Sequence, residues 1–350
     1  MIAERLTAQL LAGPPAGDPV TAVRRILAVQ GQDPRGARLA IRARTAGISV
    51  ADVDRALTVD RSLVIGWLNR GTLHLVRSED YFWLQFLTTP SIFTANARRL
   101  AQEGVSPAAA ERGVATVSRS LGEEGPLTRA QLRDRLDAAG VPTQGQALIH
   151  VLLLASLRGL IVRGPMVGGQ HAFVLVRDWL GEPPPIDGDT ALSEMARRYL
   201  AGHGPANDRD LARWAGLSLN HARAGLRSIG SELEERPDGL IDLSGRPPAA
   251  EAPGPRLLGA FDPLLLGWRS RAPIVGAHQC LVTVNGLFRP FALVRGRAVA
   301  TWSMASGDIV VDPLEAMTPE DIAALELDAQ DVARYLGVGA RFSVLEHVRS

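Results

Sequence analysis

The stretch Leu121-GEEGPLTRAQLRDRLDAAGV, residues 121–141, has the same layout as Leu200-AGHGPANDRDLARWAGLS, residues 200–218. Each predicts the end of one helix, a Gly-Pro break, a polar N-cap (Thr128 or Asn207) and a second helix. The two copies start 79 residues apart (200 minus 121), which is a domain-sized spacing rather than a solenoid repeat. A weaker third copy begins near Ile48, with Ser49 as its N-cap.

A pattern typical of a short β-hairpin follows each copy. The paired segments that we expect to be strands are 62–71 with 72–76, 160–164 with 171–176, and 233–236 with 240–243. The turn residues Pro165-MVGGQ and Pro237-Asp238-Gly239 join the second and third pairs. Two helices followed by a two-stranded wing, three times along one chain, indicate tandem winged helices.

The remaining segments complete the predicted α+β fold. Residues 183–185 and 245–255 are interpreted as linkers, residues 257–304 as strand-rich with turns at Asn285-Gly286 and Gly296, and the stretch from Thr318 as an acidic closing helix. We therefore predict winged-helix units at residues 1–90, 91–182 and 183–250. A β-rich C-terminal segment with the closing helix occupies residues 251–350.

Composition excludes several chemistries. All 38 basic residues among the 350 are arginine, which excludes a Schiff-base lysine and a phosphate-loop lysine. GC-rich codon bias is the ordinary explanation for the origin of this absence. Cys280 is the only cysteine, so a disulfide framework is excluded and a reducing cytosol fits. With no signal sequence and no run of 18 apolar residues, we expect a soluble, cytoplasmic, bacterial-type protein that spans no membrane.

Charge is graded along the chain. Residues 1–100 carry 13 arginines against 8 acids, and residues 301–350 carry 3 against 9. A basic front and an acidic tail allow an anionic partner at one face, although many neutral enzymes have similar gradients. We expect the acidic tail to lie away from such a partner.

Motifs for metal, cofactor or covalent catalysis are missing. The seven histidines form no HxxxH or HExxH pair, and neither GxSxG nor GxGxxG after a strand occurs. We therefore expect no metal site and no cofactor. An enzyme of this sequence would act without an obvious covalent nucleophile.

The segment around Gln30-Gly31-Gln32 has the most distinctive pattern. Asp33-Pro34 predicts a helix start, with the helix running to about Thr45. Arg35, Arg38 and Arg42 follow at i, i+3 and i+7, so they share one helix face, and Arg44 flanks it. Two amides thus lie beside arginines and a helix N-terminus, both of which bind phosphates.

A plainer interpretation of this segment is a polar connector before a solvated basic helix. A second Gln-Gly-Gln, residues 144–146, lacks the Asp-Pro and the arginine face. We expect that copy to start a helix of the second unit.

The chain resembles the AlkZ-type, YcaQ-related winged-helix DNA glycosylases. The matching places are Gln30-x-Gln32-Asp33-Pro34, the run Arg70-Gly71-Thr72-Leu73-His74, Phe261-DPLLLG, and Gly296-Arg297 with Thr301-Trp302. The resemblance implies tandem winged helices around a central channel, with Gln30 and Gln32 as the catalytic pair. Gly31 departs from the apolar residue common between them.

The resemblance implies excision of bulky N7-alkylated purines, unhooking of interstrand crosslinks, and self-resistance to a genotoxin. Glutamine suits such a base, which leaves as a neutral molecule once a water and the nucleotide are positioned. Asp33 is a weaker candidate, since an N-cap carboxylate is engaged. Without lysine there is no lysine-based lyase step, so we predict a monofunctional enzyme.

The predicted partner is double-stranded DNA that carries alkylated purines or crosslinks, bound by a monomer. The candidate contacts are Arg35, Arg38, Arg42, Arg70, His74, Gln170 and His171, the last two in the hairpin Pro165-MVGGQHAF. The alternatives are an ion pair at the turn for Arg70, a packed histidine for His74 and an ordinary wing tip for the hairpin. Phe261, Asp262 and Trp268 are expected to be structural.

Two other functions fit the repeated units. One is a winged-helix transcription regulator without catalysis, which would read base edges and bind as a dimer. The other is a protein-interaction scaffold that does not bind DNA. The sequence leaves open the lesion, the genotoxin, crosslink processing, the part played by Asp33 and the oligomeric state.

Overall fold

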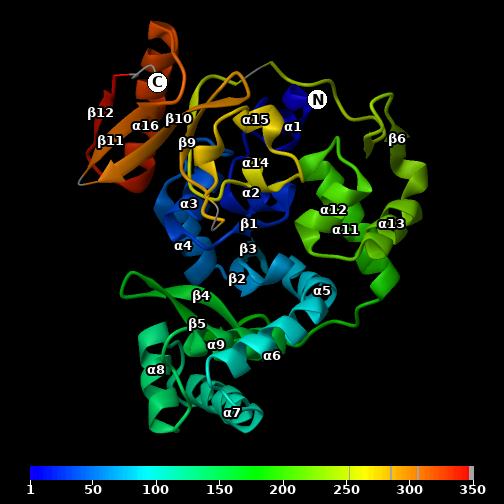
Figure 1. The fold of residues 1–350 in the computed structure, drawn as a ribbon, viewed down its shortest axis with the longest axis vertical. Coiled ribbons are helices and arrows are strands. Elements are labelled where there is room, and N and C mark those ends of the chain that lie inside the picture. Colours follow the sequence, from blue (N-terminus) through cyan, green and yellow to red (C-terminus); the bar gives the residue numbers. More distant parts are fainter. Residues whose placement is uncertain (252, 284–285, 306, 347–350) are drawn as a thin grey trace. The chain divides into compact units, whose positions relative to one another are not determined.

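Residues 1–251, 253–283, 286–305 and 307–346 are described by a computed structural model. Helices and strands are mixed along the chain, as Figure 1 shows, which confirms the predicted α+β class. The contacts between residues divide the chain into two units. Unit 1 comprises Met1–Val53, Ser193–Trp214 and Leu219–Ser350, and unit 2 comprises Asp54–Leu192 and Ala215–Ser218.

Unit 2 contains two of the predicted hairpins and the helices around them. Its helices are α4 (Val50–Thr58, from Asp54 on), α5 (Ser78–Thr88), α6 (Phe93–Gln102), α7 (Pro107–Glu124), α8 (Arg129–Ala138), α9 (Ala147–Leu157) and α10 (Val176–Trp179). Its strands are β2 (Leu63–Trp67), β3 (Leu73–Arg77), β4 (Ile161–Val167) and β5 (Gln170–Leu175). The order helix, helix, hairpin is therefore present in α8, α9, β4 and β5, as the sequence predicts.

The two hairpins of unit 2 join into one antiparallel sheet in the order β3-β2-β4-β5. The junction between them is the pair Ile65 and Arg163. The start of α8 is fixed by a capping box, in which the Thr128 hydroxyl accepts from the Gln131 backbone N–H and the Gln131 side chain accepts from the Thr128 N–H. Local residues thus build the module, and sheet pairing connects two modules.

Unit 1 contains the third module. It consists of α11 (Gly188–His203), α12 (Asp208–Ala215), α13 (Leu219–Ser228), β6 (Leu233–Glu235) and β7 (Ile241–Leu243). Asn207 caps α12 as predicted, because its side-chain oxygen accepts from the Asp210 N–H at 2.9 Å. The β6–β7 turn closes with a bond from the Arg236 N–H to the Leu240 carbonyl.

The rest of unit 1 combines the two ends of the chain. Its N-terminal elements are α1 (Ile2–Ala8), α2 (Pro19–Ile26), β1 (Val29–Gln30) and α3 (Pro34–Arg42). Its C-terminal elements are β8 (Arg256–Leu258), α14 (Pro263–Leu266), α15 (Ala272–Val275), β9 (Phe291–Val294), β10 (Arg297–Ala305), β11 (Asp308–Pro313), α16 (Pro319–Leu336) and β12 (Arg341–Val344).

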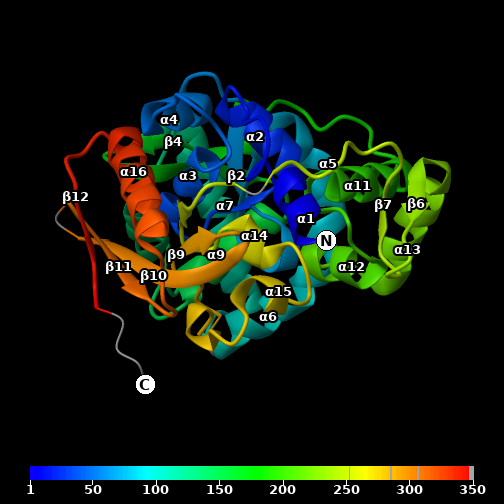
Figure 2. The same cartoon turned by 90° about the horizontal axis from the view of Figure 1, so that it is seen from above.

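The C-terminal strands form a sheet in the order β12-β11-β10-β9-β8. Strands β11 and β12 are parallel, and α16 is the crossover between them. Figures 1 and 2 both show α16 lying along this sheet. The predicted β-rich C-terminal segment and its closing helix are therefore confirmed.

Two details differ from the sequence predictions, and two predicted turns have different outcomes. Residues 263–275 form the short helices α14 and α15 instead of strands, since Asp262 caps a Pro-initiated helix. Helix α3 ends at Arg42 rather than near Thr45. The turn at Gly296 is present, with Arg295 and Gly296 both at positive φ, whereas the one expected at Asn285-Gly286 falls partly outside the described residues.

The predicted boundaries at residues 90, 182 and 250 are divisions along the sequence and stay a prediction. The spatial units divide elsewhere, because long-range pairing joins segments that local patterns cannot connect. None of the helices in the part of the chain that the structure describes is long and apolar enough to cross a membrane.

Candidate functional site

Gln30 and Gln32 lie in unit 1, at the junction between β1 and α3. Gln30 ends β1 and is only 6% exposed, whereas Gln32 is exposed. Asp33 caps α3, and its carboxylate accepts from the Arg35 N–H at 2.9 Å. The carboxylate of Asp33 is therefore engaged at the helix start, as expected for an N-cap residue.

Glycines hold this helix start against the segment after β8. A Cβ on Gly36 would lie 2.3 Å from the Ala260 carbonyl oxygen, and one on Gly259 would lie 2.9 Å from the Gly36 Cα. Backbone thus packs directly on backbone. Glycine inside a helix costs roughly 1 kcal/mol relative to alanine, and here it permits a close contact that fixes the start of α3, which follows the glutamines.

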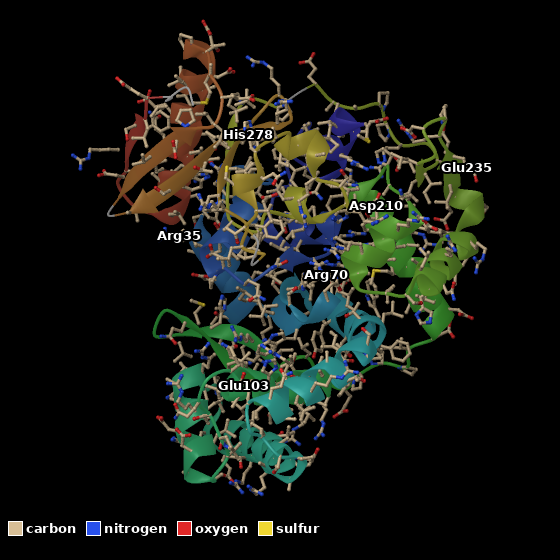
Figure 3. The ribbon with its side chains drawn as sticks, in the orientation of Figure 1. Arg35, Arg70, Glu103, Asp210, Glu235 and His278 are labelled. Carbon is tan, nitrogen blue, oxygen red and sulfur yellow. The ribbon has the colours of Figure 1, made fainter. Side chains whose placement is uncertain are left out.

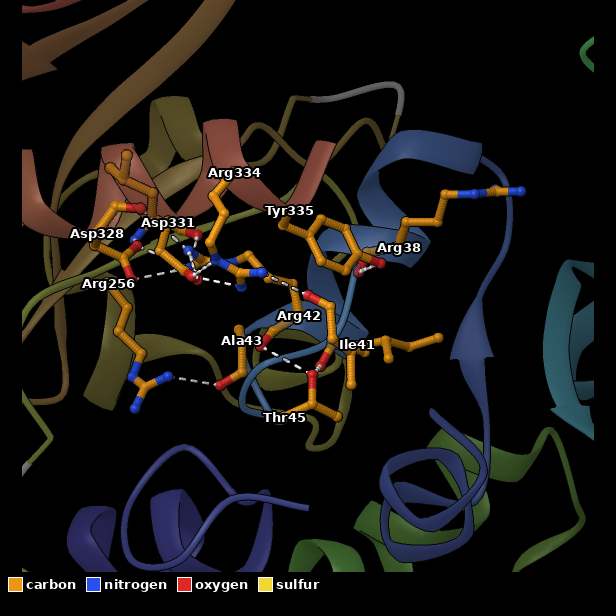
Figure 4. Close-up of polar contacts among 12 residues, drawn as sticks. Arg38, Ile41, Arg42, Ala43, Thr45, Arg256, Asp328, Asp331, Arg334 and Tyr335 are labelled. Atoms are coloured by element: carbon orange, nitrogen blue, oxygen red, sulfur yellow. Dashed lines mark hydrogen bonds and ion pairs between the residues drawn. The ribbon is translucent and has the colours of Figure 1, made fainter. Parts of the chain in front are cut away.

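Arg42 is an internal residue that binds the closing helix. Its side chain is 2% exposed, and it pairs with Asp328 at 2.8 Å and Asp331 at 3.1 Å (Figure 4). It also donates to the Leu257 carbonyl. The charge of Arg42 is thus compensated inside the fold, which does not favour the predicted contact with DNA phosphate, and that contact stays a prediction.

Arg44 is also an internal residue. Both its guanidinium and the Asp262 carboxylate have 0% exposure, and they form two parallel hydrogen bonds of 2.9 and 2.8 Å. Arg44 also donates to the Gln9 side chain and to the Ala40 carbonyl. The prediction of a structural Asp262 is confirmed, and Trp268 is likewise buried.

Arg35 and Arg38 occupy different environments on α3. Arg35 is exposed, and its guanidinium donates to the Met304 carbonyl at 3.3 Å (Figure 3). Arg38 is 6% exposed and donates to the Pro34 carbonyl, and its side chain extends away from the Asp328–Asp331 cluster in Figure 4. Of the three arginines predicted to share a phosphate-binding face of α3, Arg35 is thus the one that is exposed at the surface.

In unit 2, Arg70 and His74 lie on the β2–β3 hairpin. Arg70 and Gly71 both have positive φ, at 58° and 73°, which makes the turn tight. Arg70 is half-buried. His74 is 3% exposed, and its Nδ1 lies 3.0 Å from the Thr72 carbonyl. Burial, with the charge of Arg70 adding to it, lowers the pKa of His74 to about 3.

His74 is therefore a neutral, packed residue at physiological pH. Its ring is buried within unit 2, which does not favour the predicted contact with DNA, and that contact stays a prediction. The alternative of a packed histidine is correct. Arg70 keeps its place among the candidate contacts.

Gln170 and His171 begin the second strand of the β4–β5 hairpin. Gln170 is exposed and His171 is half-buried. Gly168 and Gly169 form the tip with positive φ, and Val167 beside them is 38% exposed. Between the base and the tip, the register shifts between Arg163 and Met166, and the Met166 N–H donates to the Thr58 hydroxyl. The hairpin thus carries polar side chains beside a glycine turn.

Arg163 is a candidate that the sequence analysis missed. Its guanidinium lies over Trp67 at 5.0 Å and over Phe173 at 4.6 Å. Among the described residues it forms no hydrogen bond or ion pair, and its Nε is buried without a partner. Burial, with Arg129 nearby, lowers its pKa to about 10. The available signal was one arginine at an otherwise apolar strand position in Leu160-Ile161-Val162-Arg163.

The described residues offer no obvious metal centre. Among them, no three histidine, cysteine, aspartate or glutamate side chains are grouped so that they could hold a metal ion.

Comparison with known proteins assigns the family. Residues 23–335 match the family model described as "DNA glycosylase AlkZ-like", and the chain belongs to that family. It is 31% identical over 347 residues to an "Interstrand DNA cross-link repair glycosylase" of Streptomyces sahachiroi, with 90% of each chain covered. It also resembles the solved structure of Streptomyces sahachiroi DNA glycosylase AlkZ, at 26% identity and a TM-score of 0.80, with 98% of each chain covered.

These comparisons confirm the resemblance inferred from the sequence motifs. The AlkZ-like family is a DNA glycosylase family, and nothing in these matches supports the transcription-regulator alternative. The matched residues include the Gln30–Asp33 segment and the hairpins β2–β3, β4–β5 and β6–β7.

Proposed function

We propose that the protein is a monofunctional DNA glycosylase that excises bulky N7-alkylated purines and unhooks interstrand crosslinks. The observation that carries the proposal is the Gln30-Gly31-Gln32 segment, held at the glycine-packed, Asp33-capped start of α3 in a chain of the AlkZ-like family. The relative from Streptomyces sahachiroi is named for interstrand crosslink repair. Self-resistance to a genotoxic natural product is the physiological role that we propose.

The proposed excision reaction does not require a strong general acid or base. Cleavage of the bond between base and sugar passes through a cationic, oxocarbenium-like sugar, and an N7-alkylated purine leaves as a neutral base. Amide oxygens can accept a hydrogen bond from the attacking water and direct a negative dipole at the cation. Correct positioning alone can supply roughly 7–11 kcal/mol. Gln30 and Gln32 are assigned these two tasks.

An undamaged purine would react poorly at this segment. Its departure needs a strong acid or carboxylate, and the carboxylate of Asp33 is held by the Arg35 N–H. The weakness of the amides is thus a source of selectivity. We assign Asp33 a structural role in fixing the helix start rather than a direct part in catalysis.

DNA is bound by the proposed tandem winged helices around a central channel. We propose that Arg35 and Arg70 contact phosphates, and that Gln170 and His171 enter a groove with the hairpin tip. Arg163 joins this set, because among the described residues its guanidinium lies over two aromatic rings but forms no hydrogen bond or ion pair. Arg38 is kept only as a buried residue that supports α3.

The absence of lysine from the sequence supports the monofunctional assignment. A lyase step would need an amine to form an imine with the abasic site, and the remaining amine, the N-terminus of Met1, is paired with Glu4 at 2.7 Å. We therefore propose that the product is an abasic site in an uncut strand. We further propose that a monomer carries out this reaction in the cytoplasm.

The test is a cleavage assay on a duplex that contains a bulky N7-alkylguanine. Heating in mild alkali after incubation should cut the strand at the lesion for the wild type. Gln30→Ala and Gln32→Ala should each lower the rate by about 10²-fold or more, as when one group that stabilises a transition state is lost. Gln144→Ala, in the second Gln-Gly-Gln, is the matched control and should keep full activity.

Two results would contradict the proposal. Equal cleavage by wild type and by both variants, Gln30→Ala and Gln32→Ala, would remove the glutamines from the mechanism. Cleavage before the alkali step, or a covalent DNA adduct trapped by borohydride, would contradict the monofunctional assignment.

A further inference from the structure

A pocket on unit 1 lies outside the glutamine segment and its arginines. Its volume is about 260 Å³, and its lining includes Arg5, Asn207, Asp210, Trp268, Arg269 and Ser270. These residues come from α1, from the start of α12 and from the loop after α14. Figure 3 labels Asp210 on α12. None of them belongs to the proposed catalytic or DNA-binding set.

Arg5 is the unusual residue of this pocket. It is only 5% exposed, and its guanidinium carbon lies 4.5 Å from the centre of the Trp268 ring. Its Nε donates to the Pro205 carbonyl at 3.1 Å. Among the described residues, neither terminal nitrogen of Arg5 has a hydrogen-bond or ion-pair partner. A buried cation thus presents its two best donors to a cavity.

The surface under the Arg5 guanidinium is fixed. The Trp268 indole N–H donates to the His203 carbonyl at 2.9 Å, and the His203 ring packs against Trp268 at 5.9 Å. His203 in turn stacks on Tyr199 at 4.8 Å. The guanidinium is therefore held in one place before any ligand arrives, which reduces the entropic cost of binding.

Asp210 also faces the pocket, and its negative charge is already in use. One carboxylate oxygen accepts from the Arg269 N–H at 2.9 Å and the other from the Asn207 N–H at 3.3 Å. Asp210 thus holds Asn207 and Arg269 at the pocket. Among the described residues, the Asn207 side-chain N–H₂ and the Ser270 hydroxyl have no hydrogen-bond partner.

We propose that this pocket binds a phosphate-type oxyanion. The planar fork of Arg5 matches two oxygens of such an anion, and the Asn207 amide, the Ser270 hydroxyl and the exposed Arg269 supply donors from other sides. A protonated phosphate oxygen can donate to Asp210, which offsets the repulsion of that carboxylate. The anion comes either from a free phosphate or from a DNA backbone, and both present the same chemistry.

The test follows the indole N–H signal of Trp268 by nuclear magnetic resonance, assigned by its loss in Trp268→Phe. Inorganic phosphate is titrated into the full-length protein at constant ionic strength set with sodium chloride. We expect a saturable shift of this signal. Arg5→Gln should weaken the apparent affinity by about tenfold or more, since hydrogen bonds to charged groups are the strong ones. Arg112→Gln, which removes an exposed charge on α7, should leave the affinity unchanged.

Ser270→Glu keeps Arg5 in place and adds a carboxylate at the pocket, so it serves if Arg5→Gln does not fold. It should abolish the phosphate-dependent shift. A second arm titrates an undamaged duplex and identifies the source of the anion. If the duplex shifts the Trp268 signal and this shift is lost in Arg5→Gln, the anion is a DNA phosphate. A signal that responds only to inorganic phosphate indicates a free anion. A Trp268 signal unmoved by both, or moved equally in Arg5→Gln, would overturn the proposal.

Discussion

The tripeptide Gln-Gly-Gln occurs twice in this chain, at residues 30–32 and 144–146, in different surroundings. In the first copy, Gln30 is buried, and the following helix is capped by Asp33 and packed through Gly36 on Ala260. In the second copy both glutamines are exposed. There Glu103 (Figure 3) accepts from the Gln146 N–H at 2.9 Å, and the Gln146 side chain makes no capping bond.

The difference shows that the tripeptide alone carries no chemistry. In the first copy the buried amide of Gln30, flanked by fixed backbone, can hold a water in place, whereas in the second copy both amides are exposed. Catalytic groups need to be held within fractions of an ångström of their working geometry. The residues that distinguish the copies are thus Asp33, Gly36 and the arginines after them.

The largest expected effect comes from breaking the buried ion pair between Arg44, just after α3, and Asp262. Asp262→Ala leaves Arg44 buried and uncompensated, which should lower the free energy of unfolding by about 3–5 kcal/mol. Urea unfolding measures the loss. Asp331→Ala is the matched control, because Arg42 keeps Asp328, and it should cost less than about 1 kcal/mol. Equal losses for the two variants would contradict the argument.

Gly36→Ala should displace the first copy. Its Cβ would lie 2.3 Å from a backbone oxygen, so the start of α3 must shift. A displacement of about 1 Å can cost about 10²-fold in rate, and we expect that loss in kcat/KM for base excision. Gly145→Ala strains the second copy, where φ is +56°, and should leave excision unchanged. Retained activity in Gly36→Ala would show that the close packing does not position the glutamines.

Acid should destabilise the fold through two buried histidines, His74 in unit 2 and His203 in unit 1. Burial lowers the pKa of each to about 3, whereas the unfolded chain titrates near 6.5. The unfolded state therefore binds protons that the folded state does not, and stability falls as the pH drops from 6.5 towards 3. At pH 5 each histidine should cost about 2 kcal/mol. His74→Gln should remove about half of this loss, and an unchanged pH profile would contradict the assignment.

The smallest expected effects come from the caps of the two helices. Asp33→Ala should cost about 1 kcal/mol of unfolding free energy, because the Arg35 N–H loses its acceptor. Glu103→Ala should cost at most about 0.5 kcal/mol, since α9 is buried along almost its whole length. Thermal unfolding compares them. A larger loss at Glu103 would mean that the second copy is the more tightly held one.

Local signals made the modules predictable. The N-caps at Thr128 and Asn207, the glycine tip of the β4–β5 hairpin and the Asp33-Pro34 helix start act within a few residues of themselves. Their structural outcome can therefore be derived from short stretches of sequence. The family motifs also extended along the chain far enough to indicate the fold class and the glycosylase family.

The differences between the sequence predictions and the structure have a common physical cause. Arg42 lies on the predicted face of α3, yet its partners Asp328 and Asp331 are distant in sequence, and no local pattern reveals them. His74 lies on the strand where the pattern predicts it, but its ring is buried within unit 2 instead of facing solvent. The exposure of an arginine or a histidine depends on which distant segment covers it. The sequence analysis did not identify the Arg5 pocket or Arg163 for the same reason. The acidic tail, which we expected to lie away from an anionic partner, supplies the carboxylates that pair with Arg42.

The pairing of α3 with α16 has a consequence for how the protein is made. Asp328 follows Arg42 by 286 residues, so the counter-charge for that buried arginine leaves the ribosome long after the glutamine segment does. At about 5–20 residues per second, the delay is roughly 15 to 60 seconds. During synthesis the basic helix is exposed and without its acidic partner. The glutamine segment reaches its final geometry only when the chain is nearly complete.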